Sequence, residues 1–594
     1  MKLFILLSLT LSAGRTGAEI FDYVIVGAGT AGLVIANRLS EDPSNTVAVI
    51  EPGTDQRTNP NVTDWSRFTQ AFGTSIDWQY QTVKQSGADG RVLDLHQGKA
   101  WGGTSTINGM AYIRGDLAQF DAWEGLGNPG WNWESLFPYY KKSEMYTVPS
   151  DTQLAAGATY EPQYHGFNGH VHTGYPSALM NGSFASPIIQ TWEGLSLPHN
   201  PDLNSGSVRG FSMGPQTLDR ALDVRWDSAR AYYYPVGTRS NLRIIKGTVK
   251  RINWSSKEHK RSGCSNSLLV ADEVEFLDDN GDSQIVGVRK EVIVSAGAVR
   301  TPLVLEYSGI GNPRILEGLG IQTRVDLPGV GENLQEQPNH VLAYIGSTEL
   351  GSSASAYHTF ISLRDLFGDD IDQLQESTGA KLSSWAQAAV EASGNGALNV
   401  TAVTKLLRVQ HNLLFKQNVT AAEIITAVAP TGGGLLASNF WILLPFSRGS
   451  VHLGSIDQIN KPVIDPRFFL AEFDLDATIA LGKYAQKFWF SEPIASSVIG
   501  PLIPGADILP NNATSAQWET YIRSTVGVNS HPLGTAAMMS RELGGVVDPQ
   551  LKVYGTANVR VVDASVFPTQ FSGHLTATIY AVAERAADII KQAI

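Results

Sequence analysis

The 594-residue sequence contains a single cysteine, Cys264, so it cannot form an internal disulfide and its stability must come from its core. The cysteine lies among Ser262, Gly263 and Ser265, small residues that indicate an exposed loop. Beyond its first segment the sequence has no apolar run of about 20 residues, so no membrane span is predicted. Basic residues are fewer than acidic ones, and the net charge of -12 argues against a nucleic-acid partner.

The composition is otherwise typical of a globular protein. Hydrophobic residues make up 43% of the chain and charged residues 17%, which argues against disorder. A chain of this length is too long for one compact core, so two or more domains are predicted.

Residues 1–18 have the pattern of a secretory signal. Lys2 provides the charged start, Leu3 to Leu11 form the apolar run, and Thr16-Gly17-Ala18 form a small-residue cleavage site. The run is too short to span a bilayer. Glycosylation sequons support secretion and begin at Asn61, Asn181, Asn253, Asn399, Asn418 and Asn512. We therefore expect a secreted glycoprotein.

The stretch Phe21–Glu51 has the pattern of a dinucleotide-binding unit. A short apolar strand leads into Gly27, Gly29 and Gly32 in G-x-G-x-x-G spacing, then into a helical pattern and a second strand that ends at Glu51. Gly27 permits the tight turn, Gly29 lets a pyrophosphate approach the backbone, and Gly32 lets helix and strand pack closely. The helix N-terminus offers N–H donors, and the acidic residue can hold a ribose hydroxyl.

Further along the chain, several segments have the patterns of regular structure. The glycine-rich stretch Gly98–Met110 lets the backbone approach a flat or phosphorylated ligand. An Asn280-Gly281 turn between two apolar runs predicts a hairpin. The other expected elements are strands at 291–296, 440–444 and 558–562, helices at 301–311, 424–428 and 574–592, and a loop or lid at 59–88.

Four separated motifs together resemble the glucose-methanol-choline (GMC) oxidoreductases, the flavoprotein family of glucose oxidase, glucose dehydrogenase and aryl-alcohol oxidase. The motifs are the fingerprint at 27–32, the stretch at 98–108, the segment at 297–311 and the region from Asn529-Ser530-His531-Pro532 to His574. The likeness is greatest to secreted fungal glucose dehydrogenases and oxidases, through residues 73–80, 108–112, 229–235 and 544–564.

The resemblance implies an α/β protein of two domains. The first is a Rossmann-like FAD-binding domain, and the second is a substrate-binding domain built on an antiparallel sheet with helices. The FAD-binding domain is expected to be discontinuous, over 20–60, 90–120, 215–325 and 540–594. The substrate-binding domain and a lid are expected over 61–89, 121–214 and 326–539.

The resemblance also implies FAD as the cofactor. Glu51 is expected on the adenosine ribose, Val249 near the adenine and Asp563 beside the flavin chain, with residues 103–108 along the pyrophosphate and isoalloxazine. The full expected set is Gly27, Gly29, Thr30, Ala31, Gly32, Glu51, Gly103, Thr104, Asn108, Gly109, Val249, Asp563, Ala564 and Thr576. No metal site is expected.

Oxidation of an alcohol removes a proton from oxygen and a hydride from carbon. The flavin accepts the hydride at N5, and the protein supplies the base. Histidine suits that task because its unperturbed pKa of about 6.5 lies near working pH. By resemblance, His531 is the base, His574 hydrogen-bonds the substrate oxygen, and Glu423 orients His574. Only the fold can bring the two histidines together, because 43 residues separate them.

The expected substrate pocket departs from that of the glucose enzymes. Gly527 stands where those enzymes have an arginine, four residues before the base, and Phe68 replaces a tyrosine of the sugar pocket. Asn529 is kept, and Ser530 stands where the family often has an aromatic residue. The remaining expected pocket residue is Trp441. A site that lacks a hydrogen-bonding partner can lose about 10⁴ in discrimination for that group, which disfavours glucose.

We therefore expect a secreted FAD-dependent oxidoreductase of a non-glucose alcohol, such as an aromatic, furan-type or polyketide-derived intermediate of secondary metabolism. The electron acceptor is expected to be O2 or a quinone-type compound. Two alternatives remain open: a glucose or aldose dehydrogenase or oxidase with a rebuilt clamp, and a non-redox lyase or cyclase on the same fold. Net flavin bleaching by a substrate would separate the last from the others.

Overall fold

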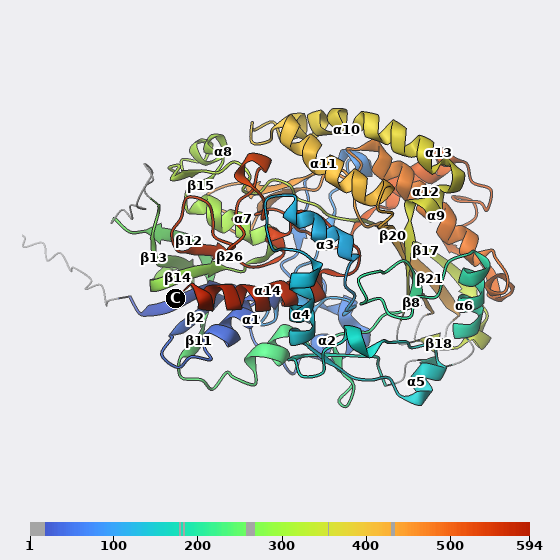
Figure 1. Ribbon diagram of the computed structural model, residues 1–594, viewed down its shortest axis with the longest axis horizontal. Helices are drawn as coiled ribbons and strands as arrows, with labels where there is room; N and C mark the ends of the chain where they lie inside the picture. Colours follow the sequence, from blue (N-terminus) through green and yellow to red (C-terminus); the bar gives the residue numbers. More distant parts are fainter. Residues whose placement is uncertain are drawn as a thin grey trace, which may run out of the picture.

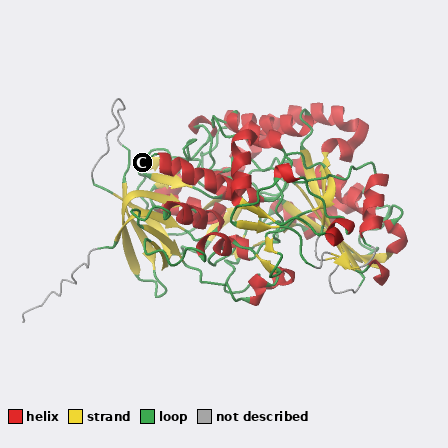
Figure 2. Cartoon of the chain, turned by 60° about the horizontal axis from the view of Figure 1, so that its bottom comes forward, coloured by secondary structure: helices red, strands yellow, loops and turns green. Residues whose placement is uncertain are grey.

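The computed structural model describes residues 18–177, 180–181, 184–256, 268–353, 356–428 and 434–593. Cys264 and, apart from Ala18, the expected signal segment lie outside these residues. Over the described part of the chain, the protein is a mixed α/β structure with two seven-stranded sheets (Figure 1). The two sheets lie toward opposite ends of the molecule (Figure 2). The α/β class expected from the sequence is confirmed.

The first sheet has the strand order β11-β2-β1-β14-β13-β12, and β26 also pairs with β14. The strands β11, β2, β1, β14 and β26 run parallel, whereas β14, β13 and β12 form an antiparallel meander. Every residue of β2 is buried, as is typical of a parallel strand covered on both faces. The bounds are β11 (Leu242–Lys246), β2 (Val47–Glu51), β1 (Ile20–Val26), β14 (Ser283–Val294), β13 (Ala271–Leu277), β12 (Thr248–Trp254) and β26 (Val559–Val561).

Glycines shape the turn between β1 and helix α1 (Thr30–Leu39). Gly27 has a φ of +102°, in the left-handed region that favours glycine. A Cβ atom on Gly32 would lie 2.1 Å from the Gly27 oxygen, so a side chain there would force helix and turn apart. Helix α1 begins without a side-chain cap and without an acidic residue in its first turn, which leaves N–H donors for an anion.

The second sheet is antiparallel and has the order β24-β17-β21-β20-β19-β8, with β25 also paired to β17. In β21, Asn439 and Trp441 line a cavity, whereas Leu436 and Phe440 belong to the hydrophobic core that includes helix α12. Because successive side chains of a strand point to opposite faces, one face of this sheet lines the cavity and the other packs against helices. The bounds are β24 (Val498–Ile503), β17 (Pro338–Gly346), β21 (Leu435–Ile442), β20 (Thr420–Val428), β19 (Tyr357–Ser362), β8 (Gly210–Met213) and β25 (Gly527–Val528).

The longer helices gather in two groups (Figure 1). Helix α14 (Leu575–Gln592) packs against α1 and α4 (Trp133–Ser143), beside the first sheet. Helix α12 (Glu472–Trp489) packs against β21 and α13 (Ser515–Thr525), beside the second sheet. The remaining helices are α2 (Pro60–Thr63), α3 (Leu117–Glu124), α5 (Asp151–Ala155), α6 (Ala185–Gly194), α7 (Gly297–Tyr307), α8 (Pro313–Gly318), α9 (Leu363–Phe367), α10 (Ile371–Ser393) and α11 (Val400–Phe415).

The structure corrects three expectations from the sequence. Residues 424–428 are not helical but extend β20, where pairing with β19 and β21 decides their conformation. The expected strand at 291–296 is present over residues 291–294, but as the second part of β14, which runs unbroken from its antiparallel pairing with β13 into its parallel pairing with β1. The region 59–88 is not only loop: it contains α2, a 3-10 helix (Trp65–Ala71) and β3 (Tyr80–Gln81).

The first sheet takes its strands from 20–51, 242–294 and 559–561, and the second from 210–213, 338–442 and 498–528. On this basis we propose the domain division expected from the sequence, in which both ends of the chain belong to the FAD-binding domain.

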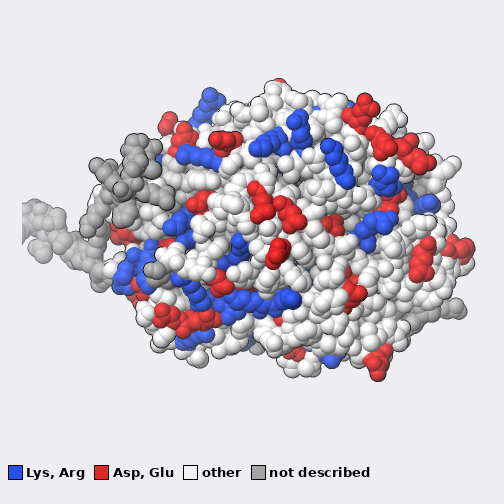
Figure 3. Space-filling view, viewed as in Figure 1, with Lys and Arg blue, Asp and Glu red and all other residues white. Residues whose placement is uncertain are grey.

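Among the described residues, no helix combines the length and apolarity needed to cross a membrane. On the face drawn in Figure 3, Lys and Arg side chains are interspersed with Asp and Glu among wide uncharged areas.

Candidate active site

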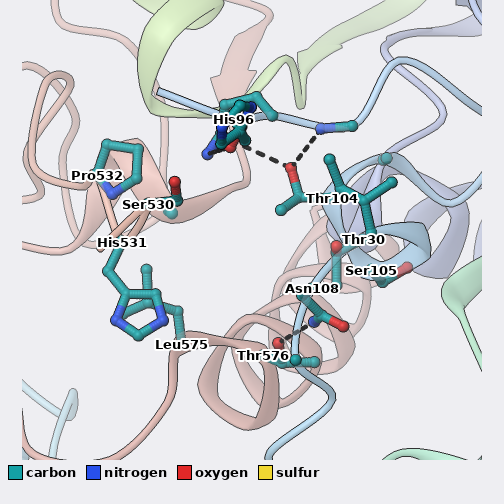
Figure 4. A pocket seen from close by; sticks show the side chains of 18 of the residues that line it. Thr30, His96, Thr104, Ser105, Asn108, Ser530, His531, Pro532, Leu575 and Thr576 are labelled. Carbon is teal, nitrogen blue, oxygen red and sulfur yellow. Dashed lines mark hydrogen bonds between the residues drawn. The ribbon is translucent and has the colours of Figure 1, made fainter. Parts of the chain in front are cut away.

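A cavity of about 710 Å³ is lined from both sheets. One wall comes from the turn after β1 and from the stretch Gly98–Met110, and another from the second sheet and the segment 528–532. Figure 4 looks into this space, with His531 on one side and Thr30, Asn108 and Thr576 on the other. The size and the mixed lining are those of a site for a small molecule.

At one end of the cavity, two glycine-rich segments meet backbone to backbone. A Cβ on Gly103 would lie 2.7 Å from the Cα of Gly29, so side chains are excluded where the two loops touch. Beside them, the buried Glu51 carboxylate accepts hydrogen bonds from the N–H of Ala28 (2.9 Å) and of Gly53 (2.7 Å). Each carboxylate oxygen keeps acceptor capacity for a ribose hydroxyl. Burial raises the pKa of Glu51 to about 7, against the effect of those two hydrogen bonds.

A buried arginine fixes the neighbouring stretch. Arg225 donates to the Ser105 carbonyl (3.3 Å) and to Asn108 Oδ1 (2.7 Å), and burial lowers its pKa to about 10. The Asn108 amide in turn donates to Thr576 Oγ1 (3.1 Å), at the start of α14 (Figure 4). Helix α14 is thereby joined to the glycine-rich stretch that contains Asn108.

Most of the residues expected from the sequence line this one cavity. The two exceptions are Gly32, which packs against the Gly27 carbonyl, and Glu423, which is buried behind the cavity wall. The lining includes Gly27, Gly29, Thr30, Ala31, Glu51, Gly103, Thr104, Asn108, Gly109, Val249, Asp563, Ala564, Thr576, Phe68, Trp441, Asn529, Ser530, His531 and His574.

Asp563 has a second task that its sequence position did not indicate. Its Oδ2 accepts from the Gly297 N–H (2.9 Å) and from Thr301 Oγ1 (2.6 Å), and so satisfies donors at the start of α7. Burial raises its pKa despite these contacts.

The fold brings the two predicted histidines together. The ring centroids of His531 and His574 are 5.3 Å apart with perpendicular planes, and Trp441 lies edge-to-face against both rings. Burial lowers the pKa of His531 to about 3, with a further contribution from His574, so the His531 imidazole is neutral. Ser530, directly before it, has a φ of +62°, a conformation that non-glycine residues rarely adopt and that fixes the direction of the chain at this point.

Two partners of His531 were not identified from the sequence. The ring atom His531 Nδ1 lies 2.8 Å from Gln337 Oε1 and 3.0 Å from Asn529 Nδ2. The backbone N–H of His531 donates to Glu336 Oε1 (2.9 Å). The shorter contact, with a carbonyl oxygen, favours the tautomer with the proton on Nδ1 and a lone pair on Nε2, while the Asn529 amide donates to Gln337 Oε1 (2.9 Å) rather than to the ring. Burial raises the pKa of Glu336 to about 8.

A third histidine, His358, was also missed. Glu423 Oε1 lies 3.1 Å from His574 Nε2 and 2.8 Å from His358 Nδ1. Burial alone would raise the pKa of Glu423, but the charge of His574 and the hydrogen bond from His358 lower it to about 2. The ligand atoms of these three side chains lie within 4.8 Å of one another, as in a metal site, but hydrogen bonds to one carboxylate already account for that geometry.

Known proteins match this chain over most of its length. Two family models described as GMC oxidoreductase match residues 21–339 and 445–583. The glucose oxidase-like protein fsoC of Humicola fuscoatra is 61% identical, over 100% of this chain and 99% of that protein. Glucose oxidase of Penicillium chrysogenum is 35% identical, over 97% of this chain and 93% of that enzyme.

Solved structures are similar over equally long stretches. An FAD-dependent oxidoreductase from Chaetomium thermophilum has a TM-score of 0.85 at 29% identity, over 96% of this chain and 99% of that one. A fungal aryl-alcohol oxidase has a TM-score of 0.81 at 26% identity, over 96% and 99% of the two chains.

Glycine at position 29 provides a test of cofactor binding. We expect Gly29→Glu to abolish FAD binding, because its carboxylate would occupy the cavity beside the helix N-terminus and repel a pyrophosphate. The measurement is the flavin absorbance per chain after purification.

Gly29→Ala is the matched control. Its Cβ would meet only the Ser295 carbonyl oxygen, at 3.8 Å, so the fold should tolerate it. Stoichiometric FAD in the glutamate variant would contradict the assignment of this turn to the pyrophosphate.

Proposed function

This chain belongs to the GMC oxidoreductase family and is an FAD-dependent oxidoreductase of CH–OH donors, and we propose that it oxidises an alcohol less polar than glucose, with His531 as base. The observation that carries the proposal is the pair of histidines on one cavity wall, with one ring neutral and the other bound to a buried carboxylate. When bound, FAD supplies the hydride acceptor.

The expected role of His531 follows from its surroundings. With its Nδ1 proton held by Gln337, the ring offers the Nε2 lone pair to a substrate hydroxyl. Its lowered pKa keeps that lone pair free of protons throughout the neutral range. A base of low pKa is a weak one, so deprotonation needs help from a group that stabilises the alkoxide.

His574 is suited to give that help. Its Nε2 contacts the buried Glu423 carboxylate, which fixes the orientation of the ring. A hydrogen-bond donor on this ring stabilises the developing negative charge on the substrate oxygen. The two histidines thus divide the work: His531 accepts the proton and His574 stabilises the oxygen that loses it.

The substrate side of the cavity favours an alcohol with apolar surface. Its lining includes several large apolar side chains, namely Phe68, Phe72, Ile425, Val428, Leu435 and Trp441. Gly527 contributes no side chain, and Phe68 has no hydroxyl. A sugar would lack the two polar partners expected at these positions in the glucose enzymes, at a cost of about 1–3 kcal/mol for each hydroxyl left unpaired. The relatives named glucose oxidase favour the competing proposal, a sugar substrate, and the same assay decides between them.

The cellular setting is part of the proposal. The signal pattern of residues 1–18 supports secretion, and the oxidase names of several relatives support O2 as the acceptor. A pathway of secondary metabolism would supply an alcohol of the proposed class.

Loss of the base should slow the chemical step. We expect His531→Ala to lower the rate of anaerobic flavin reduction by about 10²–10⁴, the usual contribution of a general base. Stopped-flow absorbance measures the rate, and the flavin content of each preparation shows that the fold is retained. The control is His172→Ala, which removes a half-buried histidine that contacts Asp219 and Trp226 away from the cavity. A near-normal rate in the His531 variant would remove this residue from the mechanism.

Substrate class is tested by the ratio of kcat/KM for glucose to kcat/KM for a benzylic or furan alcohol, with a dye acceptor. We expect the ratio to favour the less polar alcohol, because the pocket lacks two polar contacts for a sugar. A ratio that favours glucose by about tenfold or more would return the protein to the sugar oxidoreductases.

Gly527→Arg is the companion variant. Gly527 is paired with Asn339, a cavity-lining residue, so a side chain at 527 would project from the same face. A Cβ there would meet only the Asn339 carbonyl oxygen, at 3.8 Å. Turnover of glucose should rise in this variant and not in Gly527→Leu, which adds bulk without a guanidinium.

A further inference from the structure

We propose that His358 is a positioning residue of the reaction, whose neutral imidazole donates a hydrogen bond to Glu423 and holds that carboxylate against His574. The inference rests on the proposed function, because it gives His358 an effect only through His574. Three observations carry it: the contact geometry, the register of the sheet and the fixed position of the ring.

The contact geometry makes Glu423 Oε1 the meeting point of two imidazoles. His358 Nδ1 lies 2.8 Å from this oxygen, closer than His574 Nε2 at 3.1 Å. The two rings are perpendicular, with centroids 5.4 Å apart, so they approach the oxygen from different directions. The other carboxylate oxygen, Oε2, is buried and has no partner in the described part of the chain. Both imidazoles therefore act on one atom.

The register of the second sheet places His358 there. Phe360 of β19 lies opposite Glu423 of β20, and His358 lies opposite Ile425. Residues two apart on a strand share a face, so His358 is the diagonal neighbour of Glu423 on the cavity side. Its other flank is closed by a glycine: a Cβ on Gly214 would lie 2.7 Å from the Cδ2 atom of His358. These neighbours hold the His358 ring where its Nδ1 can donate to Glu423.

Burial assigns a neutral state to the His358 imidazole. The side chain of His358 is 6% exposed and that of His574 12%, and burial lowers the pKa of His358. His358 is therefore a neutral donor to the carboxylate, and His574 is the ring that lines the cavity beside His531. His531, the other titratable group facing this cluster, is neutral as well.

Loss of the donor at His358 should shift the acid limb of the pH profile of the flavin-reduction rate. A hydrogen bond to the charged form of a carboxylic acid lowers its pKa, so removing it raises the pKa of Glu423. The carboxylate would then be protonated at a higher pH than in the wild type, and His574 would lose its anionic partner. Removal of a hydrogen bond to a charged group is expected to lower the rate on the order of 10- to 100-fold.

The test compares His358→Leu, which fills the space without a donor, with His358→Asn, whose amide nitrogen can replace Nδ1. Anaerobic flavin reduction by a substrate of the wild type is followed from about pH 4 to pH 9. In the leucine variant, we expect a lower plateau and an acid limb at higher pH. The asparagine variant should restore most of both. The control is His340→Leu, a buried histidine of β17 outside the cavity lining, which should leave the profile unchanged.

Three results would overturn the inference. A wild-type profile in His358→Leu would show that the contact has no effect, and equal losses in the leucine and asparagine variants would show that the ring only fills space. If the leucine variant does not fold, Gly214→Ala replaces it: its Cβ should displace the ring and shift the acid limb in the same direction, and an unshifted limb is the third contrary result. His574→Ala separates the two proposals, because a normal rate in that variant contradicts the proposed function itself.

Discussion

The site depends on one buried charge. The Glu423 carboxylate is out of contact with solvent, and an anion in that position is tolerated only when donors reach it. One donor comes from β19 in the second sheet, and the other from His574, at the start of helix α14. Because α14 packs on α1 of the first sheet, the same contact joins the two sheets. The contacts that stabilise the buried Glu423 carboxylate are thus also the contacts that orient His574 in the site.

The two faces of the second sheet have different roles, because successive side chains of a strand point to opposite faces. Along β20 and β21, one set of alternate residues enters the core against helices, and the other set faces the cavity. A row of paired residues crosses this face through Phe360, Glu423, Trp441 and Asn339, and Gly527 extends it beyond β17. Changes on the cavity face can therefore alter the substrate without disturbing the core on the other face.

The sequence predicts the parts of the site that depend on local rules. The turn at Gly27 and the close packing at Gly32 follow from backbone geometry, and the α/β class follows from the patterns of strand and helix. His358 and Gln337 could not be predicted, because their roles depend on which strand lies beside which and in what register. The same holds for residues 424–428, whose short apolar run fits helix or strand until its neighbours are known. The motif around His531 indicated a base but not the contacts that set its tautomer.

The pairing of β26 with β14, and the packing of α14 on α1, have a consequence for the synthesis of the protein. The first sheet begins at residue 20, yet its last strand ends at residue 561 and its covering helix at residue 592. A ribosome therefore releases almost the entire chain before the nucleotide-binding sheet can close, and the second sheet is complete first. Until then the face of α1 that packs against α14 lacks its partner, and such exposed apolar surface favours aggregation. A truncation before residue 559 would remove β26 and α14 together, and with them the cavity-lining residues Asp563, Ala564 and Thr576.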